Sequence, residues 1–544
     1  MRLKLTFLTL LAVIGMGLSH AQSEGFEELK SLELMDQIYE HLDLYFVDEI
    51  PHGKLSKTAI DAMLNELDPY TVFYHEANIE DYRLMTTGQY GGIGASLGEI
   101  GEYTYITDIN ENSPAQKGGL LAGDKILRVD NKNVLQKTTD EISNALKGPK
   151  GTSVAIEVQR GDKSIILNLT RDEIKIPDIP FAGMIDETTG YISLSSFTQT
   201  AAEEVKKNIL DLQARGMKKL IFDLRGNGGG LLMEAVKIVG FFVPKGQEVV
   251  STKGRSKQEN MVYKTQENPI AENLPLVVLI DDHSASASEI VAGALQDLDR
   301  AAILGSTSYG KGLVQRTFDL KYGSKMKLTI AKYYTPSGRC VQRLDYYDNN
   351  SGSSPKEIPD SLLQQFSTKN GRKVIDGRGI EPDIEIIDSV MSSFTKALVR
   401  QHMIFHFATQ YHSTHESIDT PDKFKLSEEG YTRFIAFVQT QNFTFNSYES
   451  TLLDQLKKSL QEKNEYAKVS KNFEALQEEL SLPMSYFFII NKTEISALLA
   501  SEIVGRFFYE KGKNQYGFRN NRVLTKALEV LNNDNEYRTL LHIK

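Results

Sequence analysis

The chain has 544 residues, of which 40% are hydrophobic and 25% are charged, and its formal net charge at pH 7 is −10. These values are typical of a globular protein with several domains, and the acidic balance argues against a nucleic-acid partner. Cys340 is the only cysteine, which excludes an internal disulfide, so the fold must depend on its hydrophobic core.

Residues 1–21 have the pattern of a secretory signal peptide. Arg2 and Lys4 precede the apolar stretch 5–18, and Ser19-His20-Ala21 offers a small-residue cleavage site. Because the apolar stretch is shorter than the roughly 20 residues that span a bilayer, we expect cleavage and not a membrane anchor. The mature protein is then expected in the periplasm or the outer cell envelope.

The next two regions differ in their periodicity. Segment 25–87 repeats apolar residues at helical spacing, as in Leu34, Ile38 and Leu42, which predicts a helical region. Segment 88–172 alternates apolar and polar residues between turn formers, which predicts a small β-rich module. Its expected strands are 103–109, 125–129, 153–159 and 164–169, with one helix at 139–146.

Segment 173–388 alternates strand and helix patterns, which predicts an α/β core. Within it, the polar stretch 345–373 is expected to be a mobile loop. Segment 389–544 is polar and helical and contains no catalytic motif. If it has a role, we expect it to bind a regulatory partner or another copy of the chain. The fold class is therefore multidomain, combining α/β and β regions. The expected core strands are 191–197, 220–224, 276–280 and 302–304, and the expected helices are 201–215, 231–242 and 286–298.

Ser286 is the first candidate catalytic residue. It lies in an alternation of serine and alanine between a buried strand and a helix, where a hydroxyl would be presented at a helix N-terminus. With Glu289 it also forms a capping box, which would need no catalysis. Three alternating serines exceed what a cap needs, however, and the N–H of Ala287 could hold an oxyanion beside a nucleophile.

Lys311 lies between Gly310 and Gly312 and is the candidate general base. An amine can accept a proton near neutrality only if its pKa falls from about 10.4 to roughly 7–8, which burial can achieve. The apolar residues Leu313 and Val314 would supply such surroundings, and the neutral Gln315 could orient the amine. The alternative interpretation is a lysine in a surface turn.

The glycine-rich loop 226–230 follows an expected strand and precedes an expected helix. Glycines there would let backbone N–H groups of Gly228 or Gly229 face a ligand, as an oxyanion hole requires. A tight strand-to-helix turn would explain the glycines equally well.

Three other patterns are weaker. Segment 305–311 resembles a phosphate-binding loop, but Gly312 stands where a hydroxyl must bind magnesium, and a strand pattern follows where a helix is needed. His283 is too close in sequence to Ser286 to act on it. His402 and His406 lack an acidic partner and predict a solvated helix face. We therefore expect no metal and no cofactor.

Taken together, segments 284–290 and 310–315 resemble the carboxyl-terminal processing (tail-specific) proteases, which are serine–lysine peptidases with a PDZ domain. The resemblance covers roughly residues 30–388, and segments 334–339 and 379–383 share it. It implies that Ser286 is the nucleophile, Lys311 the base and Gln315 the residue that orients the lysine. It also implies an oxyanion hole made by the N–H of Ala287 and of Gly228 or Gly229.

The β-rich module 88–172 resembles the PDZ domain of this family. The resemblance implies that Tyr90, Gly91, Gly92, Ile93 and Gly94 hold the terminal carboxylate of a peptide, while the strand after them pairs with it. The expected function is thus a secreted endopeptidase that binds flexible protein C-termini and cleaves near them. The resemblance also implies a resting state in which Ser286 and Lys311 are held too far apart for a hydrogen bond. The alternatives are a peptide-binding scaffold without activity and a nucleotide-dependent enzyme.

Overall fold

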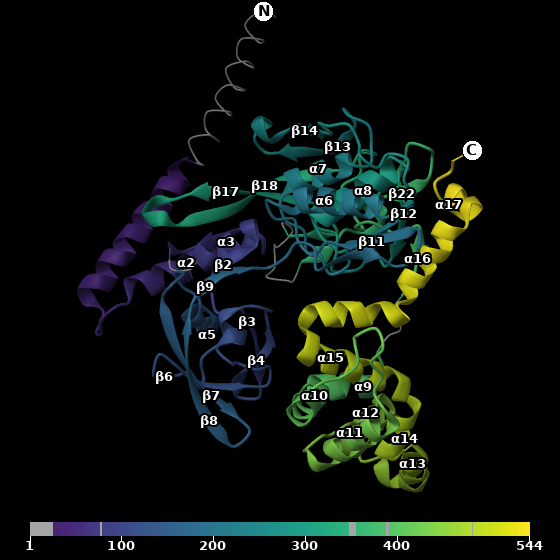
Figure 1. Ribbon diagram of the computed structural model, residues 1–544. Helices are drawn as coiled ribbons and strands as arrows, with labels where there is room; N and C mark the ends of the chain where they lie inside the picture. Colours follow the sequence, from purple (N-terminus) through teal and green to yellow (C-terminus); the bar gives the residue numbers. More distant parts are fainter. Residues whose placement is uncertain (1–24, 77–78, 347–354, 388–390, 481, 544) are drawn as a thin grey trace, which may run out of the picture.

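The computed structural model describes residues 25–76, 79–346, 355–387, 391–480 and 482–543. The expected signal peptide, residues 1–21, lies outside them. An α/β core occupies one end of the molecule, and a β-rich module and a C-terminal helical domain lie side by side at the other (Figure 1). No helix in these described ranges is long and apolar enough to cross a membrane.

The core is built on a six-stranded sheet of order β10-β11-β12-β15-β16-β23. Strand β10 is antiparallel to β11, and the other neighbours are parallel. Because the carboxyl ends of parallel strands meet at one edge, the loops after β12 and β15 are brought together there. The strands are β10 (Phe181–Met184), β11 (Thr189–Ser193), β12 (Lys219–Asp223), β15 (Leu276–Ile280), β16 (Ala302–Gly305) and β23 (Ile384–Glu385).

Helices cover both faces of this sheet. Every residue of β15 is buried, which explains its uninterrupted apolar sequence. One face packs against α6 (Ala201–Ala214), α7 (Leu232–Gly240) and α8 (Ala287–Asp297). The other packs against α16 (Arg522–Asn532) and α17 (Asp534–Leu540) from the far end of the chain.

A second sheet stands beside the first and has the order β1-β18-β13-β14, with β17 paired to β18. Strand β17 begins two residues after Lys311, so the helix that a phosphate-binding loop needs is replaced by a strand. The strands are β1 (Val72–Tyr74), β13 (Glu248–Gly254), β14 (Met261–Lys264), β17 (Leu313–Asp319) and β18 (Lys325–Tyr334).

The β-rich module has the sheet order β3-β4-β5-β7-β8, with β6 on β5 and a separate ribbon of β2 and β9. In the described chain, one edge of strand β3 has no neighbouring strand, and helix α5 contacts β3. The elements are β2 (Gln89–Gly92), β3 (Ala95–Ile100), β4 (Tyr103–Ile109), α4 (Pro114–Lys117), β5 (Lys125–Val129), β6 (Lys132–Asn133), α5 (Thr139–Leu146), β7 (Ser153–Arg160), β8 (Lys163–Thr170) and β9 (Asp172–Lys175).

The N-terminal region is helical, as predicted, but its apolar face is not buried. It contains a helix at 25–45, α2 (His52–Asn65) and α3 (Ile79–Thr87). Leu34 and Ile38 are exposed, whereas Leu64 is buried.

The prediction of a mobile loop at 345–373 is wrong for residues 355–373. Arg372 is buried and forms ion pairs with Asp299 at 2.6 Å and Asp383 at 2.7 Å, which fix the segment to the core. Short strands form around it, namely β19 (Leu344–Asp345), β20 (Lys356–Glu357), β21 (Gln365–Ser367) and β22 (Lys373–Ile375).

The C-terminal domain has a phenylalanine-rich core of its own. The prediction of a solvated face for its histidines is wrong for His406, because this half-buried ring packs against Tyr105 of the β-rich module. The expectation that these helices bind a regulatory partner or another copy stays a prediction. They are α9 (Ser393–Arg400), α10 (Met403–Thr414), α11 (Glu428–Thr440), α12 (Tyr448–Glu462), α13 (Tyr466–Leu480), α14 (Met484–Ile490) and α15 (Lys492–Gly517).

Candidate active site

Ser286 lies at the turn between β15 and α8 in a strained backbone conformation. Its φ is 56° and its ψ is −111°, a region that residues with a Cβ rarely occupy. Such strain persists only where the surroundings hold it. The Glu289 carboxylate accepts a hydrogen bond from the Ser286 N–H at 2.8 Å, and the Tyr333 hydroxyl donates to the Ser286 carbonyl at 3.2 Å.

The three alternating serines have different environments. Ser284 and Ser288 are fully buried, and their hydroxyls donate to the carbonyls of Leu224 at 2.8 Å and Asn227 at 2.9 Å. Ser286 is only partly buried and lines a cleft of about 550 Å³. Of the three, Ser286 is therefore the one placed to meet a ligand.

Glu289 joins the serine turn to the lysine segment. This fully buried carboxylate accepts hydrogen bonds from the Ser308 hydroxyl at 2.6 Å and from the N–H groups of Gly310 at 2.7 Å and Lys311 at 2.9 Å. Burial raises its pKa, while these hydrogen bonds and that from Ser286 oppose the rise. The sequence pattern alone indicates only a capping role for Glu289, because nothing local links it to segment 308–311.

Lys311 lies in the same cleft, and its amine is 4.1 Å from the centre of the Tyr70 ring. Burial, followed by the positive charge of Lys327, lowers the pKa of Lys311 to about 8, while Glu289 and Asp68 act in the opposite direction. The amine is thus close to the range that general base catalysis at neutral pH requires. Tyr70 and Lys327 could not be predicted from the sequence, because neither residue belongs to a recognisable motif.

Gln315 follows on β17 and also lines the cleft. Its amide nitrogen donates to the Thr329 hydroxyl at 3.1 Å, which leaves its carbonyl oxygen to accept from an amine. Among the described residues, no hydrogen bond joins the Ser286 hydroxyl to the Lys311 amine, whose neighbour is Tyr70 instead.

Asn227 holds the glycine loop against the serine turn. It is fully buried, its side-chain nitrogen donates to the Leu194 carbonyl at 2.8 Å, and its side-chain oxygen accepts from the Gly229 N–H at 2.8 Å. Its backbone carbonyl accepts from the Ala285 N–H at 3.0 Å. The side chain of Asn227 therefore already occupies the Gly229 N–H.

Two N–H groups near Ser286 remain available. Gly228 is exposed in the cleft, and within the described parts of the chain its N–H has no hydrogen-bond acceptor. Ala287 is the first residue of α8, so its N–H has no acceptor inside the helix. Gly229 lies close to it, because a Cβ at Gly229 would come within 2.9 Å of the Ala287 nitrogen.

The five residues expected to hold a carboxylate lie where β2 leads into β3. Tyr90, Gly91 and Gly92 pair with β9, and Ile93 and Gly94 follow as a buried turn. In the described chain, the N–H groups of Ile93 and Gly94 have no acceptor. The turn therefore offers two free donors at the start of the free edge of β3.

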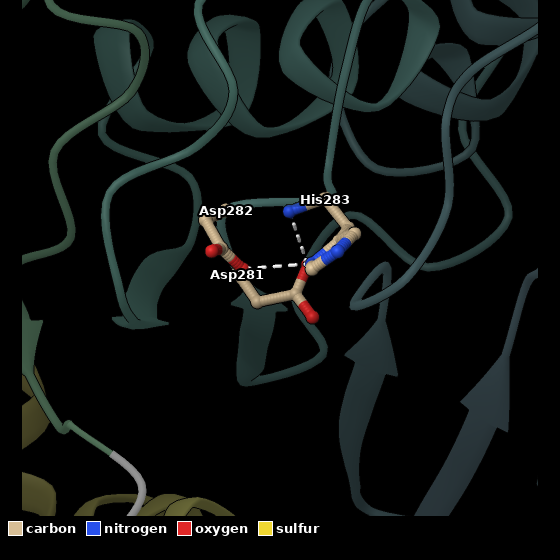
Figure 2. A group of neighbouring side chains, drawn as sticks. All are labelled: Asp281, Asp282 and His283. Carbon is tan, nitrogen blue, oxygen red and sulfur yellow. Dashed lines mark hydrogen bonds and ion pairs between the residues drawn. The ribbon is translucent and has the colours of Figure 1, made fainter. Parts of the chain in front are cut away.

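Asp281, Asp282 and His283 form a cluster of potential metal ligands just after β15 (Figure 2). One oxygen of Asp281 accepts from the N–H groups of Gly226 at 2.9 Å and His283 at 3.1 Å. His283 and Asp282 pair on the exposed surface at 2.8 Å. The Asp281 carboxylate thus holds the glycine loop to the serine turn, and the absence of a metal stays a prediction.

Models of known protein families match three parts of the chain. The model of peptidase family S41 matches residues 188–346, a PDZ domain model matches 105–160, and the model described as "Probable PDZ-protease, C-terminal helical domain" matches 394–531. A "Carboxy-terminal-processing protease" of Bartonella bacilliformis is 35% identical over 58% of this chain and 73% of its own length. A "Probable CtpA-like serine protease" of Staphylococcus aureus is 30% identical over 72% of this chain and 80% of its own.

Among solved structures, a photosystem II D1 C-terminal processing protease is 25% identical, with a TM-score of 0.38 over 66% of this chain and 88% of that one. The chain is at least 30% identical to the Bartonella and Staphylococcus proteins over more than two thirds of their lengths, which assigns it to their family. The chain belongs to the carboxy-terminal-processing proteases, the serine-type peptidases of family S41 that carry a PDZ domain.

Proposed function

We propose that the protein is a secreted serine endopeptidase that binds flexible C-termini of polypeptides through its PDZ domain and cleaves near them. The observation that carries the proposal is the cleft that Ser286, Lys311 and Gln315 share with the glycine loop. The lowered pKa of Lys311, at about 8, suits a proton acceptor. The expected signal peptide at residues 1–21 supports secretion to the periplasm or outer cell envelope.

The reaction would proceed through an acyl-enzyme. The neutral amine of Lys311 takes the proton from the Ser286 hydroxyl as its oxygen bonds to the scissile carbonyl carbon. Gln315 accepts a hydrogen bond from the amine and orients it. The negative oxygen of the tetrahedral intermediate is held by the N–H groups of Ala287 and Gly228. The carbon–nitrogen bond then breaks, and the protonated Lys311 gives its proton to the leaving amine.

Deacylation would follow the same path with water. Lys311, neutral again, takes a proton from a water molecule that attacks the ester carbon, and the same two N–H groups hold the oxyanion. Lys311 finally returns the proton to Ser286, which leaves the carboxylic acid product. Every proton in this cycle passes through one amine.

Recognition would combine an added strand with capture of a carboxylate. A peptide pairs with the free edge of β3, and its terminal carboxylate accepts from the N–H groups of Ile93 and Gly94. Residues 90–92 fix this turn by pairing with β9.

Cleavage of a folded protein with a flexible C-terminal tail tests the proposal. Ser286→Ala and Lys311→Ala are expected to lower the cleavage rate by about four orders of magnitude or more, because each removes a group that takes part in bond making. Ser413→Ala, an exposed serine of the C-terminal domain, is the matched control and should cleave like the wild type. Cleavage by Ser286→Ala would refute the assignment, and peptide binding without wild-type cleavage would favour a scaffold.

A further inference from the structure

The cleft around Ser286 carries positive charge, although the chain as a whole is acidic. Among the described residues, its lining contains Lys311, Arg316 and Lys327 and no Asp or Glu side chain. The chain has 72 acidic and 62 basic residues, so the cleft reverses the balance of the whole molecule. A cleft lined by one sign of charge attracts ligands of the opposite sign.

Two of these three cationic side chains already have another role. Arg316 forms an ion pair with Glu259 at 3.0 Å, which offsets its charge. Lys311 must be neutral to act as the proposed general base, and a neutral amine does not attract a carboxylate. Lys327 is therefore the side chain of the lining whose positive charge is left to act on a substrate.

The half-buried Lys327 ammonium has no carboxylate within ion-pair distance in the described chain. It contacts the Met85 sulfur at 3.6 Å, which is a weak acceptor, and lies 5.9 Å from the centre of the Tyr74 ring. Burial lowers the pKa of Lys327, and the charge of Asp68 opposes this. The Asp68 oxygens, however, accept hydrogen bonds from residues 70–71 of their own turn. A carboxylate that enters the cleft would supply the missing counterion.

The β17–β18 hairpin places Lys327 close to the catalytic residues. In its register Gln315 pairs with Thr329, and Thr317 pairs with Lys327. Alternate residues of a strand share a face, so Lys327 follows Thr329 on the same side at a distance of about 7 Å. An extended substrate advances about 3.3 Å per residue, so Lys327 can meet a side chain within about three residues of the bond that is cut.

We propose that Lys327 is a specificity-determining residue that binds an acidic side chain of the substrate, Asp or Glu, within three residues of the scissile bond. This inference rests on the proposed protease function and names a feature of its substrates. A bound carboxylate also offsets the charge that Lys327 exerts on Lys311, which favours the protonated form of the base. The gain is therefore expected in KM and not in kcat.

Steady-state cleavage tests this preference. The peptides share one C-terminal tail and differ only in carrying Glu or Gln at one of the three positions on either side of the cut. At one or more of these positions Glu should raise kcat/KM about three- to tenfold over Gln, through a lower KM. Because each ratio is taken within one variant at one pH, a changed basicity of Lys311 largely cancels.

Substitutions of Lys327 separate its charge from a structural role. Lys327→Met should abolish the preference for Glu, and Lys327→Arg should keep it. Lys327→Glu should reverse it, so that a peptide with Lys at that position is cut in preference to the one with Gln. Lys332→Met, on the same strand but exposed and outside the cleft, is the matched control and should keep the wild-type ratio.

Competition binding to the full chain carrying Ser286→Ala tests Lys327 without cleavage. The preferred Glu peptide should displace a fluorescent peptide with the same tail at about three- to tenfold lower concentration than the Gln peptide, and Lys327→Met should remove the difference. Equal binding of the Glu and Gln peptides at every position, or a preference that survives Lys327→Met, would overturn the inference. A wild type that cuts none of these peptides would instead refute the proposed protease function, and the binding difference would still decide the role of Lys327.

Discussion

Lys311 is subject to influences of opposite sign. Burial and the charge of Lys327 favour its neutral form, whereas Glu289 and Asp68 favour its charged form. The Tyr70 ring below the amine also favours the charge, because a cation is attracted to an aromatic face. With a pKa of about 8, roughly a tenth of the amine is neutral at pH 7.

The first prediction concerns the pH dependence of cleavage. Since only the neutral amine can take the serine proton, kcat/KM should rise about tenfold per pH unit below pH 8 and level off above it. Lys327→Met removes a like charge, which makes protonated Lys311 less unfavourable, raises its pKa and moves the inflection to higher pH. Lys332→Met, on the same strand but exposed, should leave the inflection in place. An inflection that Lys327→Met does not move would contradict this electrostatic account.

The neighbouring residues Gly228 and Gly229 should differ in how an alanine substitution affects the rate of cleavage. Gly229 has a φ of 101°, and an added Cβ would lie 2.6 Å from the Ala285 carbonyl oxygen and 2.8 Å from the Ser286 Cβ. Gly229→Ala should therefore displace the serine turn and lower kcat by at least about a hundredfold. Gly228→Ala meets open space and keeps its N–H, so it should retain most of the activity. The reverse order would show that the loop does not approach Ser286 as described.

The Glu289 carboxylate holds the β15–α8 turn and segment 308–311 together. Glu289→Gln replaces an acceptor oxygen by an amide group that donates, so at least one of the four donors around it loses its partner. We expect the free energy of unfolding to fall by about 2–4 kcal/mol and activity to fall with it. Thermal unfolding followed by calorimetry measures the first effect. Wild-type stability together with wild-type kcat would contradict the role given to Glu289.

Elements with a strong local pattern could be predicted from the sequence. Strand β15 is continuously apolar, and β4 and α5 have clear periods of two and of 3.6 residues, so their bounds agree with the prediction. The prediction for the segment around Arg372 was wrong because a polar composition is typical of a loop. The ion pairs of Arg372 with Asp299, which is distant in sequence, and with Asp383, which lies beyond a turn, form only in the folded chain. For a similar reason Tyr70 was missed and Glu289 was given only a capping role, since their contacts with segment 308–311 arise only when the chain is folded.

The C-terminal segment of the chain completes the α/β core. Helices α16 and α17 bury Val523, Leu524 and Tyr537 against the face of the sheet opposite α8. The Tyr537 hydroxyl accepts from the Leu276 N–H at 2.9 Å, at the first residue of β15. The last helices therefore support the strand that leads to Ser286.

Tyr537→Phe tests this support. The change leaves the Leu276 N–H buried without its partner, so the free energy of unfolding should fall by about 1–2 kcal/mol, with a decrease of a few degrees in Tm. Tyr448→Phe, an exposed tyrosine of α12, serves as the control and should have no effect. An unchanged Tm in calorimetry for Tyr537→Phe would show that this hydrogen bond does not stabilise the core.

In the proposed cycle the neutral amine of Lys311 activates the Ser286 hydroxyl. The rate of covalent labelling by a sulfonyl fluoride, followed by intact mass and peptide mapping from pH 6 to pH 10, tests it without a peptide substrate. We predict a single label on Ser286, a rate that rises with an inflection near pH 8, and loss of labelling in Lys311→Met. Labelling of another serine, or an equal rate and pH profile in Lys311→Met, would contradict the account.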